Sequence, residues 1–208
     1  MSFTQVFGFS QDDDDADSPP EPQRPTWFGP PEHELGITIP LDSVIAQSES
    51  GVVAISHAVV YSTGVAFDFV ARARGLSQSQ ANRLFQEQHM FEEEDLPDSL
   101  LRIGFEFADD RRASNLGGWR AHRKLMTPNA EPEDPVLMPH AGRGGNAGKG
   151  EVSLQPGYWL WPLPPAGPLR IACEWPIVDI PLTTTEIDGG KLVEASRRRI
   201  DLFPPAVG

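Results

Sequence analysis

The sequence predicts an all-β protein: an immunoglobulin-like antiparallel β-sandwich with a short inserted helix and a C-terminal helix. Four segments of the 208-residue chain alternate apolar and polar side chains with period two, a pattern typical of half-buried strands. The 21 prolines and 19 glycines suit turns and corners between strands better than a helical bundle. A chain of this length can bury enough surface to fold without a disulfide or a metal.

The first 26 residues are acidic, polar and rich in proline, so we expect residues 1–26 to form a disordered tail. The net charge is −13, and the run Asp12–Asp15 with Asp17 would repel nucleic acids and anionic membranes. We therefore expect neither as a partner. The run could instead attract a basic protein, and Phe7 and Phe9 could dock as a short linear motif. No signal-peptide or membrane-helix pattern is present, so a cytoplasmic location is expected.

Residues 27–208 are predicted to form one β-sandwich domain. Its first segment, residues 27–36, is expected to lead into the first strand. The alternating segments are residues 51–61, 64–74, 99–108 and 168–175. Short turns at 62–64 and 109–110 are predicted to close hairpins. The stretch "PLPPAGP" at 162–168 predicts a rigid corner between two strands, because proline fixes φ and cannot donate to a ladder.

Two stretches follow a helical pattern instead. Residues 77–91 begin with a capping box formed by Ser77 and Gln80, which predicts the inserted helix. Residues 184–198 follow a second candidate box, Thr183 with Glu186, and predict the C-terminal helix. Three arginines, Arg197 to Arg199, are expected to complement the negative end of that helix dipole.

The most aromatic stretch is "YWLWPLPPAGPLRIACEW", residues 158–175. Trp159 and Trp161 share one parity and would lie on the same side of a strand. We expect this side to face the inside of the fold, because each buried aromatic ring removes about 150–250 Å² of surface from water. The alternative is an exposed surface on which a sugar stacks. Tyr158 and Leu160 on the opposite parity are expected to lie under another element, such as the C-terminal helix.

No catalytic, cofactor-binding or metal-binding residues are predicted. The glycine-rich loop 141–150 lacks the first glycine and the hydroxyl of a phosphate-binding loop, so we expect an ordinary surface loop. The histidines lack zinc-ligand spacing, and Cys173 lies on a buried parity where a thiol is usually inert. His57 lies on the apolar parity of its segment. It is expected to be a core histidine with a hydrogen-bonded partner, or else part of a dispersed active site.

The predicted partner-binding residues combine an aromatic ring with nearby cations, a common contact anchor. They are Trp119, Arg120, Arg123 and Lys124, together with Phe7 and Phe9. The alternative for Trp119 is a ring folded back on the sheet. The leading hypothesis is a non-enzymatic cytoplasmic module that binds a protein partner or acts as a scaffold. The others are a carbohydrate or small-ligand binding domain that uses strand aromatics, and an enzyme with a site around His57.

Three stretches of the chain also carry a resemblance. They are "WFGPPEHELG", "LLRIGFEFADDRRASNLG" and "YWLWPLPPAGPLRIACEWP". Together they resemble a family of uncharacterised actinobacterial proteins, in which a glycine-rich loop precedes a YWxWPLPPxGPL strand pair. The match covers about residues 27–200. The resemblance implies a bacterial intracellular protein, and since the family has no assigned activity it implies no site residues.

Overall fold

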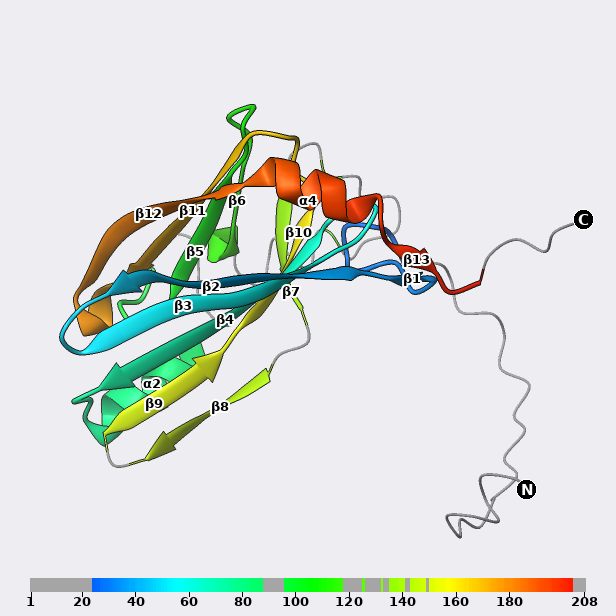
Figure 1. Cartoon of the computed structure of the whole chain (residues 1–208). Coiled ribbons are helices and arrows are strands. Elements are labelled where there is room, and N and C mark those ends of the chain that lie inside the picture. The colour runs from blue at the N-terminus through cyan, green and yellow to red at the C-terminus, as the bar shows by residue number, and fades with distance from the viewer. Residues whose placement is uncertain are drawn as a thin grey trace, which may run out of the picture.

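The protein is an antiparallel β-sandwich of two sheets, as Figure 1 shows, which confirms the predicted fold class. The structure is a computed structural model that describes residues 24–87, 96–117, 125, 132, 135–140, 143–148 and 150–203. The acidic segment before residue 24 and the ring Trp119 lie outside these residues.

The larger sheet has seven strands. Its main path runs β2 (Ile37–Gln47), β3 (Gly51–Val60), β4 (Val65–Arg74), β10 (Gly157–Trp161) and β7 (Val136–Pro139). The second half of β4 pairs with β9 (Glu151–Gln155), which pairs with β8 (Arg143–Gly148). The glycine-rich segment predicted as a surface loop is thus partly a strand, because the amphipathic strand β9 offers it an edge on which to pair.

The smaller sheet has four strands, and a separate two-stranded ladder lies beside the sandwich. The small sheet runs β12 (Ile180–Asp188), β11 (Pro168–Trp175), β5 (Arg102–Glu106) and β6 (Arg112–Ser114). The ladder pairs β1 (Glu34–Leu35) with β13 (Ile200–Asp201). Short 3₁₀ turns, η1 (Asn115–Gly117) and η2 (Pro176–Val178), follow β6 and β11.

The core between the sheets contains most of the alternating residues that the sequence predicts, except in the second half of residues 51–61, where Val59 and Tyr61 pack in a separate outer cluster. Phe67 and Phe69 of β4 are buried and contact Phe105 of β5, with ring centroids 4.8 Å and 6.4 Å apart. Ile171 and Cys173 of β11 lie in the same core. Contacts of this kind hold the two sheets face to face.

The predicted connections are confirmed. The amide of Tyr61 donates to the carbonyl of Gly64 across the β3–β4 turn (3.0 Å). In the β5–β6 turn the amide of Phe107 donates to the carbonyl of Arg111 (2.9 Å), and Asp110 adopts a φ of 66°. The proline-rich corner carries the chain from β10 in the large sheet to β11 in the small sheet.

The aromatic strand β10 is buried on both faces, and the assignment of its faces from sequence is wrong. Tyr158 and Leu160 point into the core between the sheets. Trp159 is 0% exposed but lies in a second cluster, where its indole N–H donates to the carbonyl of Thr26 (3.0 Å). The chain at Thr26 therefore covers the outer face, and Tyr158 faces the opposite sheet.

The inserted helix α2 (Gln78–Glu87) begins where the sequence predicts. The Gln80 amide donates to the Ser77 hydroxyl (3.3 Å), and the Ser77 amide donates to the Gln80 side chain (2.9 Å). This confirms the capping box. The predicted end of the helix, residues 88–91, lies outside the described residues.

The C-terminal helix α4 (Gly189–Ser196) is shorter than predicted, because Thr183 to Glu186 belong to β12. Its cap is Asp188, whose side chain accepts from the amide of Gly190 (2.9 Å). A side chain at position 189 would lie 2.7 Å from the carbonyl oxygen of Gly167. Glycine at the first helical position thus lets α4 pack closely on the proline-rich corner.

Candidate functional site: a groove between two edge strands

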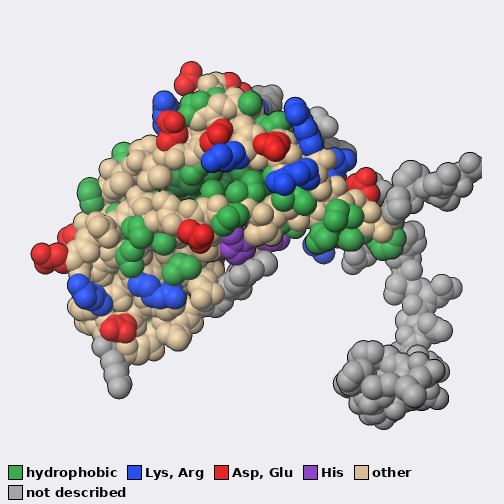
Figure 2. Space-filling model, in the orientation of Figure 1, with side chains coloured by type: hydrophobic (Ala, Val, Ile, Leu, Met, Phe, Trp, Pro, Cys, Tyr) green, Lys and Arg blue, Asp and Glu red, His purple; other side chains and the backbone are tan. Residues whose placement is uncertain are grey.

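A groove lies where the two sheets meet at one side of the sandwich. Strand β2 is an edge of the large sheet and β12 is an edge of the small sheet. The two strands touch where the Thr185 hydroxyl donates to the Ile45 carbonyl (3.3 Å). Toward the start of α4 a concavity opens between them. Figure 2 shows hydrophobic side chains in a hollow between β2 and α4.

The floor of the groove is apolar. Ile39 and Leu41 of β2 and Ile187 of β12 are partly buried and pack against the main core, and Leu192 of α4 is fully buried beneath them. The groove has a volume of about 290 Å³, just below the range of roughly 300–1,000 Å³ for drug-sized ligand pockets. It therefore suits one or two apolar side chains better than a large ligand.

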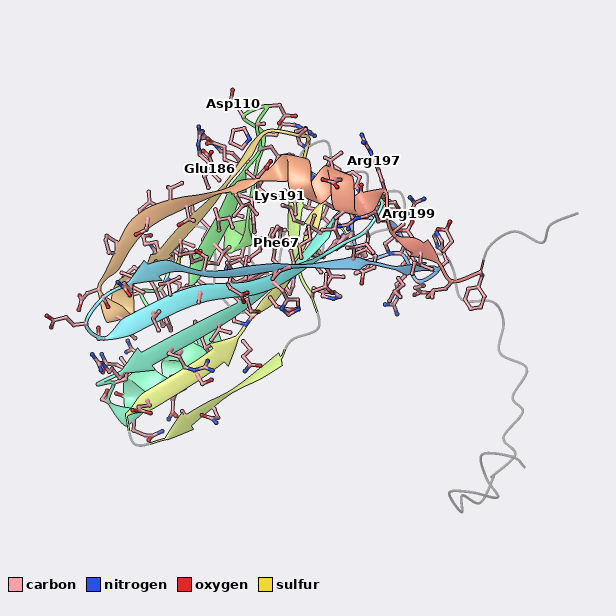
Figure 3. All side chains as sticks on the ribbon, in the orientation of Figure 1. Phe67, Asp110, Glu186, Lys191, Arg197 and Arg199 are labelled. Carbon is pink, nitrogen blue, oxygen red and sulfur yellow. The ribbon has the colours of Figure 1, made fainter. Side chains whose placement is uncertain are left out.

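The rim of the groove is charged. Glu186, Asp188 and Lys191 line it, and Figure 3 shows Glu186 and Lys191 at the junction of β12 and α4. Glu186 lies 3.6 Å from the guanidinium of Arg170. An apolar floor with a polar rim is the usual arrangement of a protein-binding surface.

Cations continue along α4 beyond the groove. Lys191, Arg197 and Arg198 are exposed, and in the described part of the chain none of them takes part in an ion pair. Arg199 donates to the buried carboxylate of Glu34 (3.1 Å). Arg199 also donates to the carbonyl of Ser196 at the end of α4 (3.5 Å), as expected for a cation at the negative end of the helix dipole, so the ion pair with Glu34 is an additional contact that the sequence did not predict.

The free edge of β2 cannot add another strand beside the groove. Pro40 has no amide to donate, and Asp42 has a φ of 41° within an irregular stretch between Pro40 and Ser43. Prolines and bulges of this kind block edge-to-edge pairing. A ligand would therefore bind the groove through its side chains, and not by extending the sheet.

A larger concavity of about 770 Å³ lies at the far end of the large sheet, between the β2–β3 turn and β8. Its two arginines already donate to backbone carbonyls: Arg72 to Ala71 (3.1 Å) and Arg74 to Glu49 (2.8 Å). Glu151 also lines it and offsets their charge. The two cations of this concavity are thus already bonded to the backbone, although it is larger than the groove.

His57 belongs to a polar cluster on the outer face of the large sheet. Its imidazole lies 2.9 Å from the hydroxyl of Ser56 through Nδ1 and 3.0 Å from the carboxylate of Asp68 through Nε2. The expectation that His57 faces the core is wrong, because an irregularity between Ile55 and His57 reverses the alternation of β3. A serine–histidine–carboxylate chain can transfer a proton, but neither concavity includes these three residues.

The other candidate residues are six that lie outside the described ranges, two tryptophans and one cysteine. Phe7, Phe9, Trp119, Arg120, Arg123 and Lys124 lie outside the described residues. Trp159 is fully buried and so cannot stack on a sugar, and Trp161 contacts Trp27 edge to face (5.9 Å). Burial raises the pKa of the Cys173 thiol to about 12, so the thiol is unreactive at neutral pH.

Within the described ranges, no three His, Cys, Asp or Glu side chains are grouped so that they could hold a metal ion. The same part of the chain contains no helix with the length and apolar character needed to cross a membrane.

A comparison with models of known protein families finds no match, and comparisons with curated proteins and solved structures find no significant match. The fold and the groove therefore define the chain as an all-β sandwich with a small apolar groove at its open side.

Proposed function

We propose that this protein is a non-enzymatic cytoplasmic interaction module, whose groove between β2 and β12 holds apolar side chains of a protein partner. The observation that carries the proposal is the groove itself: an apolar floor continuous with the core, beneath a charged rim. Buried apolar anchors surrounded by a polar rim supply most of the binding energy in protein interfaces.

The shape of the groove favours a protein over the other ligand classes. A sugar-binding face would need exposed aromatic rings, whereas Trp159 is buried beneath the chain at Thr26. A small molecule would find a shallow space of only about 290 Å³. An extended peptide needs only to insert one or two side chains and can place its remaining residues along the charged rim.

The test compares quantitative capture from a cell lysate by the immobilised full chain and by two groove variants, Ile187→Ser and Lys191→Glu. The first removes an apolar side chain from the floor, and the second reverses a charge on the exposed rim without touching the core. Loss of an interface anchor typically costs more than 1 kcal/mol, so we expect about tenfold weaker capture of a true partner.

The matched control is Leu182→Ser, which changes a 69% exposed residue of the same strand outside the groove. Capture by this variant should equal that of the unaltered protein. If both groove variants retain every captured protein as strongly as the control does, the groove is not the binding site and the proposal fails. Circular dichroism on each variant separates loss of binding from loss of fold.

A further inference from the structure

We propose that the protein's own N-terminal segment docks in this groove, through Phe7 and Phe9, and so competes with an external partner. The inference rests on the proposed function, because it uses the same groove. It identifies one occupant from three observations: where the described chain begins, the charge along α4, and the apolar groove beside that helix.

The described chain begins at residue 24 on the outer face of the large sheet, where the Thr26 carbonyl accepts from Trp159, and it reaches the end of the sandwich where α4 ends by Glu34. Glu34 accepts from Arg199, which follows α4, and β1 pairs with β13. Strand β2 starts directly after β1, so Ile39 of the groove lies only four residues beyond Leu35. The ladder at the end of α4 and the groove are thus connected through a short stretch of the chain.

The chain length allows the docking. Fourteen residues separate Phe9 from Arg24, and such a stretch spans up to about 45 Å when extended. Helix α4 starts at the groove and ends near Arg199. It has eight residues and is about 12 Å long. The segment is therefore more than three times as long as the helix that it would follow.

The charges match in order as well as in sign. Between Phe9 and Arg24 the chain carries Asp12–Asp15 and Asp17. A segment that runs from the end of α4 to the groove would lay these aspartates along Lys191, Arg197 and Arg198, which are exposed. The two phenylalanines would then reach the apolar floor. Opposite charges within about 8–10 Å attract at ordinary ionic strength.

Tethering makes a weak contact sufficient. A short flexible linker gives an effective concentration on the order of millimolar, so a docking constant near that value already fills half of the grooves. An external partner would then bind with an apparent dissociation constant about twice the intrinsic value. The segment acts as a built-in competitor of the groove.

The test uses the full chain with a nitroxide attached at position 8 (Gly8→Cys). Cys173 is buried and its thiol pKa is raised to about 12, so it stays unlabelled. In nuclear magnetic resonance spectra we expect the amide signals of Leu41, Ile187 and Leu192 to lose intensity relative to the reduced label. The signal of Ser153, in the strand β9 at the far end of the sheet, should keep its intensity.

The matched control adds Phe7→Asp and Phe9→Asp to the labelled chain, which leaves every described residue unchanged. In this control the groove signals should recover, and 1 M salt should restore them in part. Docking within one chain makes the loss independent of protein concentration. Full groove signals in the labelled chain, an equal loss in the control, or a loss that disappears on dilution would each overturn the inference.

The outcomes also separate this inference from the proposed function. If the groove signals are unaffected but Ile187→Ser loses a captured partner, the inference fails and the proposed function stands. If the signals are lost but no partner depends on the groove, the segment is the occupant and the external partner is ruled out. If both hold, Phe7→Asp with Phe9→Asp should raise partner capture by about twofold or more.

Discussion

The imidazole of His57 on β3 lies 3.0 Å from the carboxylate of Asp68 on β4, on the outer face of the large sheet. This pairing depends on one extra residue in β3. Ile55 pairs with Phe69 and His57 pairs with Asp68, which leaves Ser56 unpaired between them. A bulge of this kind turns the following side chains to the opposite face, so that Ile55 and Ala58 are both buried while His57 is partly exposed.

Deletion of Ser56 should therefore be far more harmful than loss of the histidine. Without the bulge, one half of β3 must turn its buried side chains outward and bring polar ones into the core. We expect the free energy of unfolding to fall by more than about 3 kcal/mol. His57→Gln should cost only about 1 kcal/mol. Urea unfolding of both variants measures the difference, and equal costs would show that the bulge does not set the register.

The carboxylate of Glu34 should stabilise the protein in a pH-dependent way. Burial alone raises its pKa, but hydrogen bonds from the Ser62 hydroxyl and amide and from Arg199 outweigh burial and hold the pKa below the ordinary value of 4.5. Because the pKa in the folded state is the lower one, the stabilisation is complete above pH 4.5. It is lost as the pH falls through the folded value.

We expect Glu34→Gln to lower the free energy of unfolding by about 2 kcal/mol at pH 7. The difference from the unaltered protein should shrink as the pH falls below 4.5. Glu32→Gln, at an exposed position nearby, is the control and should have little effect. A cost of Glu34→Gln that is the same at pH 7 and pH 3 would contradict the assignment.

The side chain of Asn115 links the two sheets within the core. It accepts from the Ile103 amide (2.9 Å) and donates to the Leu101 carbonyl (2.8 Å) and to the hydroxyl of Tyr158 (3.0 Å). Asn115→Ala leaves buried polar groups without partners and should cost about 2–4 kcal/mol. Ser114→Ala, at the exposed neighbouring position, should cost little. Thermal unfolding of the pair checks the prediction.

Tyr158 should resist ionisation. Burial is the main cause that raises its pKa to about 12, and the hydrogen bond from Asn115 opposes this in part. Since the folded pKa exceeds the ordinary value of 10.0, the stabilisation is present below pH 10 and is lost as the pH rises toward 12. An ultraviolet titration of Tyr61→Phe, which leaves Tyr158 as the sole tyrosine, should show no tyrosinate until near pH 12 or unfolding.

The two tryptophans of β10 should differ in their contribution to stability. Trp159 is 0% exposed, and its ring contacts Tyr61 edge to face (5.7 Å). Trp159→Ala should cost about 3–5 kcal/mol. Trp161 is only partly buried, so Trp161→Ala should cost about half as much or less. Iodide should quench Trp161 more than Trp159, and strong quenching of Trp159 in single-tryptophan variants would contradict its burial.

The sequence predicts well where one face of a strand is buried. Phe67 and Phe69 alternate with Asp68 and Val70, and they face the core as their spacing indicates. The cap of α2 is predictable because Ser77 and Gln80 contact each other within one turn. These features depend on neighbours in the chain.

The sequence predicts poorly where the determining contact is distant. Periodicity cannot tell which face of β10 meets the opposite sheet, because Trp159 and Leu160 are both fully buried. Thr183 and Glu186 look like a helix cap, but pairing with β11 holds them in β12. An extra residue such as Ser56 leaves no mark in composition.

The groove could not be predicted for a related reason. Its lining comes from residues 39–41, 186–188 and 191–192, which are far apart in the sequence and meet only because β2 and β12 are edges of different sheets. Pro40 and Asp42 do mark β2 as an edge strand. Nothing in the sequence indicates which other strand lies opposite it.

The ladder between β1 and β13 gives the molecule two unlike poles. Residues that enter before Glu34 and leave after Asp201 emerge side by side, next to the β3–β4 turn that Glu34 holds through Ser62. The opposite pole presents the β2–β3 turn around Ser50. The chain thus enters and leaves the ladder at one pole, and the opposite pole is built from a turn inside the large sheet.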